Sequence, residues 1–305
     1  MKISRSHEGI YYMLLAAMRF SVMGAAAKVI REQFNAGQLV FWRNLIGAMV
    51  LVPGLLLKPP VRKIGGKDRW LIFRGFMGTV ALYTLLYCVI VMPLGTAMTY
   101  NLTSTIWIAL FSFLFFGENA SLKIIGAIAI GFTGMLCIYQ PNMQMPWHYH
   151  LMGLLSGISS AIAYITVGKL NRYYDARLIV LSFICGGILI PLLSMLVKNV
   201  SGLPEDGIFL ISWRWPDGYE WAWIALMGLA ALFGQYFVTR AYGAEQASIV
   251  SAISYSNIIF SICLGLLLGD AFPDMVSFIG ILLIVTSGIV ISISKRSPAK
   301  VPLKH

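Results

Sequence analysis

Long apolar stretches recur along the whole 305-residue chain, and short polar segments rich in Pro, Gly or Asn separate them. A helix that crosses about 30 Å of hydrocarbon needs roughly 20 residues, so each stretch of that length is predicted as a membrane-spanning helix. The predicted helices lie at about 9–30, 36–57, 70–92, 95–116, 121–140, 149–168, 176–197, 219–242, 246–268 and 274–294. The pattern predicts an all-α integral membrane protein with ten transmembrane helices.

The composition agrees with this prediction. Hydrophobic residues make up 58% of the chain and charged residues 11%, whereas soluble proteins carry roughly 45–50% apolar and about 25% charged residues. So few charges cannot cover the surface of a soluble domain. The net charge of +11 would indicate a nucleic-acid partner in a soluble protein, but here it is expected to come from cationic cytoplasmic loops, and no nucleic acid is expected as a partner.

The distribution of Lys and Arg predicts the orientation in the membrane. With the N-terminus placed in the cytoplasm, 17 of the 23 cations fall in cytoplasmic segments, four fall outside and two fall within spans. Cytoplasmic loops of membrane proteins carry such an excess of Lys and Arg. Both termini are therefore expected in the cytoplasm, and the chain is expected to be a multi-pass protein of the inner (plasma) membrane.

The second part of the chain repeats the first. Gly117-Glu118 matches Gly269-Asp270 at a separation of 152 residues, and at the same separation Thr103 matches Tyr255. A chance match of glycines in apolar helices is the alternative. The repeat predicts two five-helix units, 1–145 and 146–305. An odd number of spans per unit inverts the second unit relative to the first, which is an architecture of many secondary transporters with a substrate site near the membrane midplane.

Several ordered motifs add a family resemblance. Phe41-Trp42-Arg43-Asn44 lies early in the second span, and Gly117-Glu118 closes the fourth span before Leu122-Lys123-Ile124-Ile125-Gly126. With ten spans in a five-plus-five repeat, this set resembles the drug/metabolite transporter superfamily, and within it the EamA-type group. The resemblance implies transport of small organic metabolites, commonly amino acids and their derivatives, and a central cavity among spans 1, 3, 4, 6, 8 and 9.

Charges within the spans are almost all positive. The twelve Asp and Glu residues lie in loops or within about one turn of a helix end, so a buried carboxylate for proton-driven export of cationic drugs is not expected. Arg19 lies ten residues into the first span, about 15 Å deep, and an Arg at that depth costs roughly 2.5–3.5 kcal/mol on insertion scales. With no acid at that depth, Arg19 is predicted to face the cavity and an anionic group of the substrate. Arg43 and Lys28, nearer to helix ends, are assigned structural or gating roles, and Lys28 is expected to snorkel towards the membrane surface.

Polar and aromatic residues gather in the spans that the resemblance assigns to the cavity. Hydroxyl and small residues also hold membrane helices together, so a packing role is the alternative for these positions. Together with Arg19, the predicted substrate-binding residues are Tyr83, Tyr87, Tyr100, Asn101, Trp107, Tyr164, Gln235, Tyr236, Tyr255 and Asn257.

The function predicted from these observations is transport and not catalysis. A zwitterionic or anionic metabolite would move by alternating access; an S-adenosylmethionine-like nucleoside metabolite is one alternative, and a membrane-embedded lipid-handling enzyme is another. That enzyme would need clustered His, Asp or Glu, and the only such pattern is His148 and His150 without a third ligand. No metal and no cofactor is therefore expected. The expected partners are the metabolite and membrane lipids, with the chain as a monomer or homodimer.

Overall fold

The computed structural model describes residues 8–61, 63–116, 122–139, 145–170, 172–201, 213–244 and 253–294. Regular secondary structure within these ranges is helical throughout. Six of the described helices, α1, α2, α3, α7, α8 and α9, are long and apolar enough to cross a membrane, and α6, α11 and α12 are shorter apolar helices. The prediction of an all-helical membrane protein is confirmed at this level.

The helices follow the apolar stretches of the sequence. Their bounds are α1 Glu8–Val29, α2 Ala36–Leu57, α3 Asp68–Val91, α4 Leu94–Leu102, α5 Ser104–Phe116, α6 Leu122–Tyr139, α7 Trp147–Leu170, α8 Ala176–Ser201, α9 Glu220–Ala244, α11 Ser256–Leu267 and α12 Met275–Ser294. One difference is that the span expected at 95–116 is divided into α4 and α5. The first part of the span expected at 246–268, and the Gly117-Glu118 pair that closes the fourth predicted span, lie outside the described residues.

The division of α4 from α5 occurs at Thr103. Thr103 keeps right-handed helical angles (φ −60°, ψ −14°), and its hydroxyl donates to the carbonyl of Tyr100 over 2.6 Å. Tyr255, which precedes α11, has nearly the same angles (φ −65°, ψ −16°), and its hydroxyl donates to the carbonyl of Leu102 over 3.4 Å. The two irregular positions therefore meet in the structure, and they are the pair that the sequence repeat aligns.

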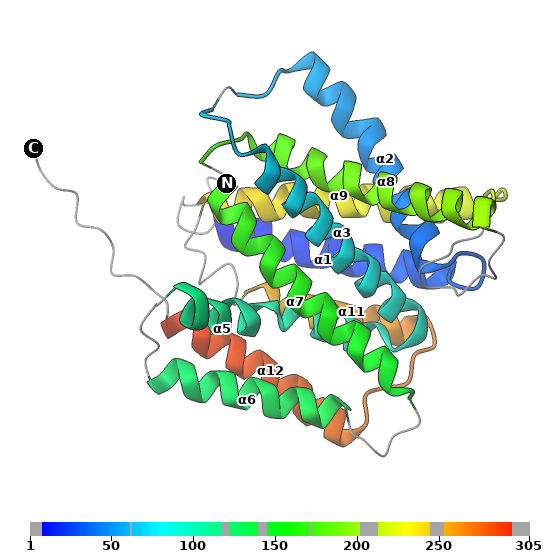
Figure 1. Cartoon of the computed structure of the whole chain (residues 1–305). Helices are drawn as coiled ribbons and strands as arrows, with labels where there is room; N and C mark the ends of the chain where they lie inside the picture. Colours follow the sequence, from blue (N-terminus) through cyan, green and yellow to red (C-terminus); the bar gives the residue numbers. More distant parts are fainter. Residues whose placement is uncertain are drawn as a thin grey trace, which may run out of the picture.

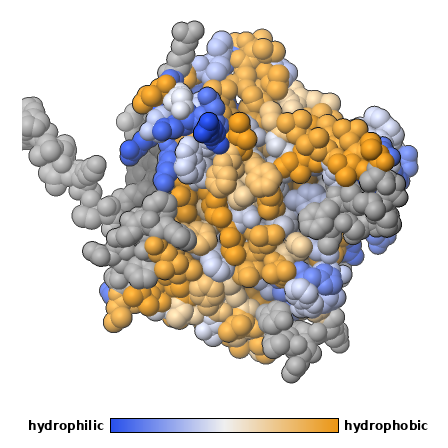
Figure 2. All heavy atoms as spheres, in the orientation of Figure 1, coloured by the Kyte–Doolittle hydropathy of each residue, from blue (hydrophilic) through white to orange (hydrophobic). Residues whose placement is uncertain are grey.

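Helices that are distant in the sequence pack together. α1 packs on α9 and α11, α3 packs on α7 and α8, and α2 packs on α8 and α9. α6 and α12 form a pair at one end of the molecule (Figure 1). Hydrophobic residues cover much of the face seen in Figure 2, as a lipid-facing surface requires.

The α6–α12 pair depends on two glycines that leave no side chain between the backbones. A Cβ atom built on Gly134 would lie 2.7 Å from the carbonyl oxygen of Gly280, and one built on Gly280 would lie 2.7 Å from the carbonyl oxygen of Gly134. Small residues of this kind let membrane helices approach closely. Gly126, on the same helix as Gly134, is exposed and has no atom within 4 Å of its own built Cβ.

A buried ion pair links the end of α1 to the α3–α4 connection and to the segment that follows α11. Lys28 pairs with Asp270, and their side chains are only 4% and 12% exposed. The Lys28 ammonium also donates to the Met92 carbonyl over 3.1 Å, and the other oxygen of Asp270 accepts from the Leu94 amide over 2.9 Å. The expectation that Lys28 snorkels is therefore wrong, because the side chain turns inward to an acid that follows α11.

We expect Gly134→Ala to destabilise the protein by about 1–3 kcal/mol, because the new methyl group overpacks a backbone contact that cannot move aside. The control is Gly126→Ala on the same helix, which meets no neighbour and should be neutral or slightly stabilising. Thermal unfolding of the detergent-purified variants measures both changes. Equal unfolding temperatures for the two variants would contradict the proposed role of the α6–α12 contact.

Asp270→Ala is expected to cost about 3–5 kcal/mol, because it leaves the Lys28 ammonium buried without a counter-charge. The double variant Lys28→Met with Asp270→Ala should recover much of that loss in the same unfolding assay. Asp217→Ala is the control, since Asp217 forms an exposed pair with Arg214 of the kind that contributes about 0–1 kcal/mol. A single Asp270 variant as stable as the control would show that the buried pair does not hold the structure.

Candidate functional site

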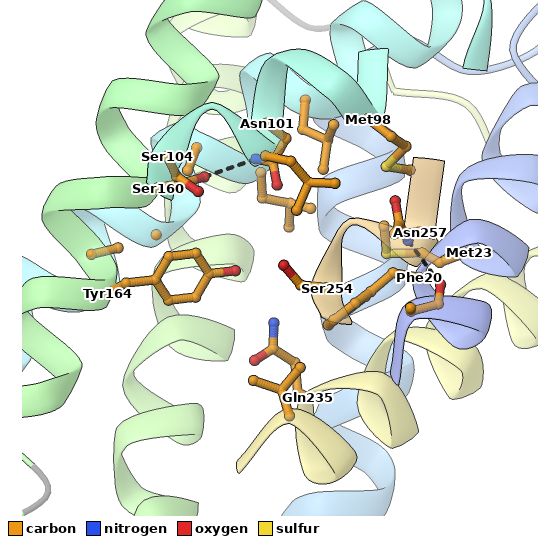
Figure 3. Close-up of a pocket in the computed structure, with 18 of the residues that line it drawn as sticks. Phe20, Met23, Met98, Asn101, Ser104, Ser160, Tyr164, Gln235, Ser254 and Asn257 are labelled. Atoms are coloured by element: carbon orange, nitrogen blue, oxygen red, sulfur yellow. Dashed lines mark hydrogen bonds between the residues drawn. The ribbon is translucent and has the colours of Figure 1, made fainter. Parts of the chain in front are cut away.

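A central cavity of about 140 Å³ lies between helices from both parts of the chain. α1, α3 and α4 form part of its wall, and α7, α8 and α9 form another part (Figure 3). No carboxylate is present among the described residues that line it. The polar residues of the wall are Arg43, Arg74, Asn101, Ser104, Thr105, Ser160, Tyr164, Gln235, Ser254 and Asn257.

Two arginines share one aromatic ring in this wall. The guanidinium carbon of Arg74 lies 4.8 Å from the centre of the Phe183 ring, and that of Arg43 lies 5.2 Å from the same centre. Both arginines are buried, with 4% of Arg43 and 6% of Arg74 exposed. Contact with a ring face stabilises a cation, and more so when the cation is desolvated. The ring therefore offsets part of the cost of burying two like charges together.

Glycines bring the helices that carry these side chains close together. On α3, a Cβ built on Gly75 would lie 2.5 Å from the carbonyl oxygen of Ser182 on α8. One turn later, a Cβ built on Gly78 would lie 2.8 Å from the Phe183 ring and 2.9 Å from Nη1 of Arg74. On α8, Gly186 packs against the backbone of α3 at Gly75. The absence of these side chains gives Arg74 the room to lie against Phe183.

Arg74 has donors that the protein does not use. Its Nε and Nη1 atoms are buried and have no hydrogen-bond partner among the described residues. A buried donor without a partner costs about 1–3 kcal/mol, and more when the group is charged. A buried donor of this kind needs a partner in the native state, and a bound ligand in the cavity can supply one.

Arg43 is held in place by neutral groups. Its Nε donates to the sulfur of Met23 over 3.3 Å, and its Nη1 donates to Oδ1 of Asn44 over 3.1 Å. Asn44 in turn donates to the Val40 carbonyl one turn back on α2. A thioether is a weak acceptor, so these contacts orient the guanidinium without neutralising its charge.

Polar groups without charge also line the cavity. Figure 3 shows Tyr164, Ser254 and Gln235 directed into one space. Asn101 donates to Ser160 over 2.8 Å and to Ser156 over 3.0 Å, which uses both hydrogens of its amide and leaves its oxygen as the group that can accept from a ligand.

Asn257 has a structural part in the same wall. Its amide donates to the Ala17 carbonyl over 2.8 Å and to the Ser21 hydroxyl over 3.1 Å, while its side-chain oxygen accepts from Ser261 over 3.4 Å. These bonds tie α11 to α1. The packing role that hydroxyl and amide groups have between membrane helices accounts for this residue.

Four of the predicted substrate-binding residues therefore line the cavity: Asn101, Tyr164, Gln235 and Asn257. Arg43, which was assigned a structural or gating role, lines it as well. Arg19 does not line it and is exposed on α1, so the expectation that Arg19 faces the cavity is corrected. The cavity side of α1 carries Ala17, Phe20 and Met23, and a helix turns about 100° per residue, which places Arg19 on another face.

Tyr236 is also outside the cavity, for the same reason as Arg19. Its side chain is 52% exposed, and its ring lies 6.0 Å from the guanidinium carbon of Arg240. The neighbouring Gln235 occupies the cavity face of α9 instead.

The remaining predicted aromatic residues pack helices together and do not line the cavity. The Tyr100 hydroxyl lies 2.7 Å from Nδ1 of His150, so that histidine belongs to a buried pair at the start of α7. Among the described residues no group of His, Cys, Asp and Glu could hold a metal ion. Trp107 packs edge-on against Phe132 at 5.1 Å, and Tyr255 reaches the α4–α5 break described above.

Tyr83 and Tyr87 lie on α3 but are not among the residues that line the cavity. Tyr83 is partly buried against the hydrophobic core. Tyr87 stacks edge-on with Tyr149 at 5.9 Å and borders a separate pocket together with Arg214 and Gln38. Leu82 and Leu85 are the residues of α3 that line the cavity at this level.

Arg74, Phe183 and Ser254 line the cavity but were not among the residues predicted from the sequence. Arg74 lies only six residues after the start of α3 and was counted among the cytoplasmic loop charges. One signal could have identified it: glycines follow Arg74 at the next position and at one helical turn, Arg74-Gly75 and Gly78, and such glycines indicate a close helix contact beside the charge.

Comparison with known proteins shows that this chain is similar to membrane transporters. The EamA-like transporter family matches residues 7–140 and 147–293. An uncharacterized transporter of Helicobacter pylori (strain ATCC 700392 / 26695) is 32% identical over 93% of this chain and 94% of its own length. The pseudopaline exporter CntI of Pseudomonas aeruginosa (strain UCBPP-PA14) is 28% identical over 94% of this chain and 97% of its own length.

Two more distant matches extend this comparison. An S-adenosylmethionine uptake transporter of Rickettsia felis is 19% identical over 94% of this chain and 93% of its own length. A crystal structure of a protein with 17% sequence identity covers 96% of this chain and 100% of its own chain with a TM-score of 0.62, which shows a shared fold. The chain is a multi-pass protein of the plasma membrane, and it belongs to the EamA-like transporter family of drug/metabolite transporters.

Proposed function

We propose that this protein carries a small zwitterionic or anionic organic metabolite, such as an amino acid or a derivative, across the membrane by alternating access around the central cavity. The observation that carries the proposal is the pair Arg43 and Arg74, both buried in the cavity wall without a carboxylate among the described lining residues. An anionic group of the substrate is the partner that would compensate this charge. Tyr164, Gln235 and Asn101 are suited to orient the polar remainder.

The proposed architecture is ten spans in two inverted units, 1–145 and 146–305, with both termini in the cytoplasm. The two family matches, one in each unit, support it. The matching backbone angles of Thr103 and Tyr255 support it as well. In this topology the Lys28–Asp270 pair lies on the outer side of the cavity, where it would have to separate for the cavity to open outward.

The cavity does not favour coupling to protons through a carboxylate. Its described polar residues are arginines, amides and hydroxyl groups, and none of these exchanges a proton readily near neutral pH. Exchange or facilitated diffusion fits this set of groups better than proton antiport.

The alternatives are less well supported. S-adenosylmethionine carries a sulfonium cation, which two neighbouring guanidiniums would repel, although a distant relative is an uptake transporter for that compound. A lipid-handling enzyme would need a cluster of titratable groups. Of the two neighbouring histidines, His148 and His150, the second is engaged with Tyr100.

Arg74→Met is expected to reduce the uptake of an anionic metabolite into proteoliposomes by roughly tenfold or more, because a hydrogen-bonded charge pair with the substrate is lost. Arg43→Met should have a similar effect. Arg19→Met is the matched control and should transport at the wild-type rate, since Arg19 lies outside the cavity. The proposal is contradicted if Arg19→Met reduces uptake while Arg43→Met and Arg74→Met leave it unchanged.

A further inference from the structure

The two arginines of the cavity wall define a ligand more closely than a single anionic group does. We propose that the cavity binds a compact dicarboxylate, with one carboxylate on Arg74 and the other on Arg43. This inference rests on the proposed transport function and names the substrate class for the same site. Three properties of the cavity support it: its charge, its hydrogen-bond donors and its size.

The charge of the cavity calls for two negative groups. Arg43 and Arg74 contact the same ring, at 5.2 and 4.8 Å from its centre, so both cations occupy one corner of the cavity. No Asp or Glu lies among the described residues of the wall. A zwitterionic amino acid would bring one negative charge and a further positive charge into this corner, whereas a dicarboxylate would neutralise both arginines.

The donors of the two arginines are arranged for two separate acceptors. Nε and Nη1 of Arg74 are buried without a partner among the described residues, and they belong to different edges of the guanidinium. Arg43 is already anchored by Met23 and Asn44, which fixes its position but supplies only neutral acceptors. A carboxylate can bridge two donors on one edge of a guanidinium, and each of the two edges of Arg74 that include Nη2 also contains one of these unpartnered donors. The hydrogen bonds of Arg43 use Nε and Nη1, so Nη2 is the group of Arg43 that can donate to the second carboxylate.

The rest of the cavity suits a short carbon chain. Its volume of about 140 Å³ is below the roughly 300–1,000 Å³ of pockets for drug-sized ligands. Phe20, Leu82 and Met98 supply apolar surface to the cavity wall. A short dicarboxylic acid has this distribution of two charged ends and an apolar centre, whereas a nucleoside-sized molecule exceeds the space.

Three probes of nearly equal length test the proposal: succinate, 4-aminobutyrate and butyrate, which end in a carboxylate, an ammonium and a methyl group, respectively. Isothermal titration calorimetry on the detergent-purified full chain gives their dissociation constants. We expect succinate to bind more tightly than both other probes by roughly ten- to a hundredfold, the equivalent of one additional charged hydrogen-bonded contact. Chloride is titrated as the inorganic reference and should bind weakly.

Variants identify the residues responsible. Arg74→Met should bring the affinity for succinate down to that for butyrate, and Arg74→Lys, which keeps the charge without the planar fork, should lie between Arg74→Met and the wild type. Gly78→Ala keeps both charges but places a methyl group 2.9 Å from Nη1 of Arg74, and it should weaken succinate binding selectively. Arg240→Met, an arginine outside the cavity, is the control. Its ratio of succinate to butyrate affinity should equal that of the wild type.

The inference is overturned if 4-aminobutyrate, butyrate or chloride binds as tightly as succinate, or if Arg74→Met leaves the ratio of affinities unchanged. Uptake of the labelled probes into proteoliposomes separates this outcome from a failure of the proposed function. Transport of 4-aminobutyrate but not of succinate would support the proposed transport function and contradict the dicarboxylate as its substrate. Tight binding of succinate without uptake of any probe would support the dicarboxylate as the ligand and contradict the proposed transport function.

Discussion

Close approach of helix backbones is the constraint on which the rest of this structure depends. In lipid, helices gain little from burying apolar side chains against each other, and packing at small residues takes over. α8 shows the effect most clearly. The backbone of α3 packs against Gly186, and the side chain of Asn44 on α2 packs against Gly187. Phe183, one turn earlier on α8, is thereby fixed between the two helices that carry the arginines.

The protein treats its buried cations in two different ways. Lys28 is matched by Asp270 and by the backbone of the α3–α4 connection, and its charge is used to hold three segments together. Arg43 and Arg74 have an aromatic ring and neutral groups around them but no described acid. The first arrangement is complete without a ligand, whereas the second stores an electrostatic cost that a bound anion would relieve.

The sequence carried enough information to predict the helices, because the length and polarity of a span are properties of consecutive residues. It did not reveal the break at Thr103, where no Pro or Gly marks the irregularity. The family was predicted from ordered motifs and is confirmed by the match over both parts of the chain.

The candidate site was harder to predict than the fold. Depth in the membrane can be counted from a sequence, and on that basis Arg19 was the strongest candidate, but the direction of a side chain around its helix depends on which helices pack beside it. Phe20 lines the cavity and Arg19, one residue away, does not. Arg74 was hidden by its nearness to a helix end. Of the predicted aromatic residues, Tyr164 lines the cavity, whereas Tyr100, Trp107 and Tyr255 contact neighbouring helices. The conclusion that an arginine within the spans lacks an acid was sound, although it applies to Arg74.

The contact between Tyr255 and the α4–α5 break has a mechanical consequence. The Tyr255 hydroxyl holds the Leu102 carbonyl, and the ring of Tyr255 fills the space that Gly288 leaves on α12. A change in bend at Thr103 would therefore pull on the start of α11 and on α12 at once. We expect the two breaks to move together, because Tyr255 contacts both the α4–α5 break and α12.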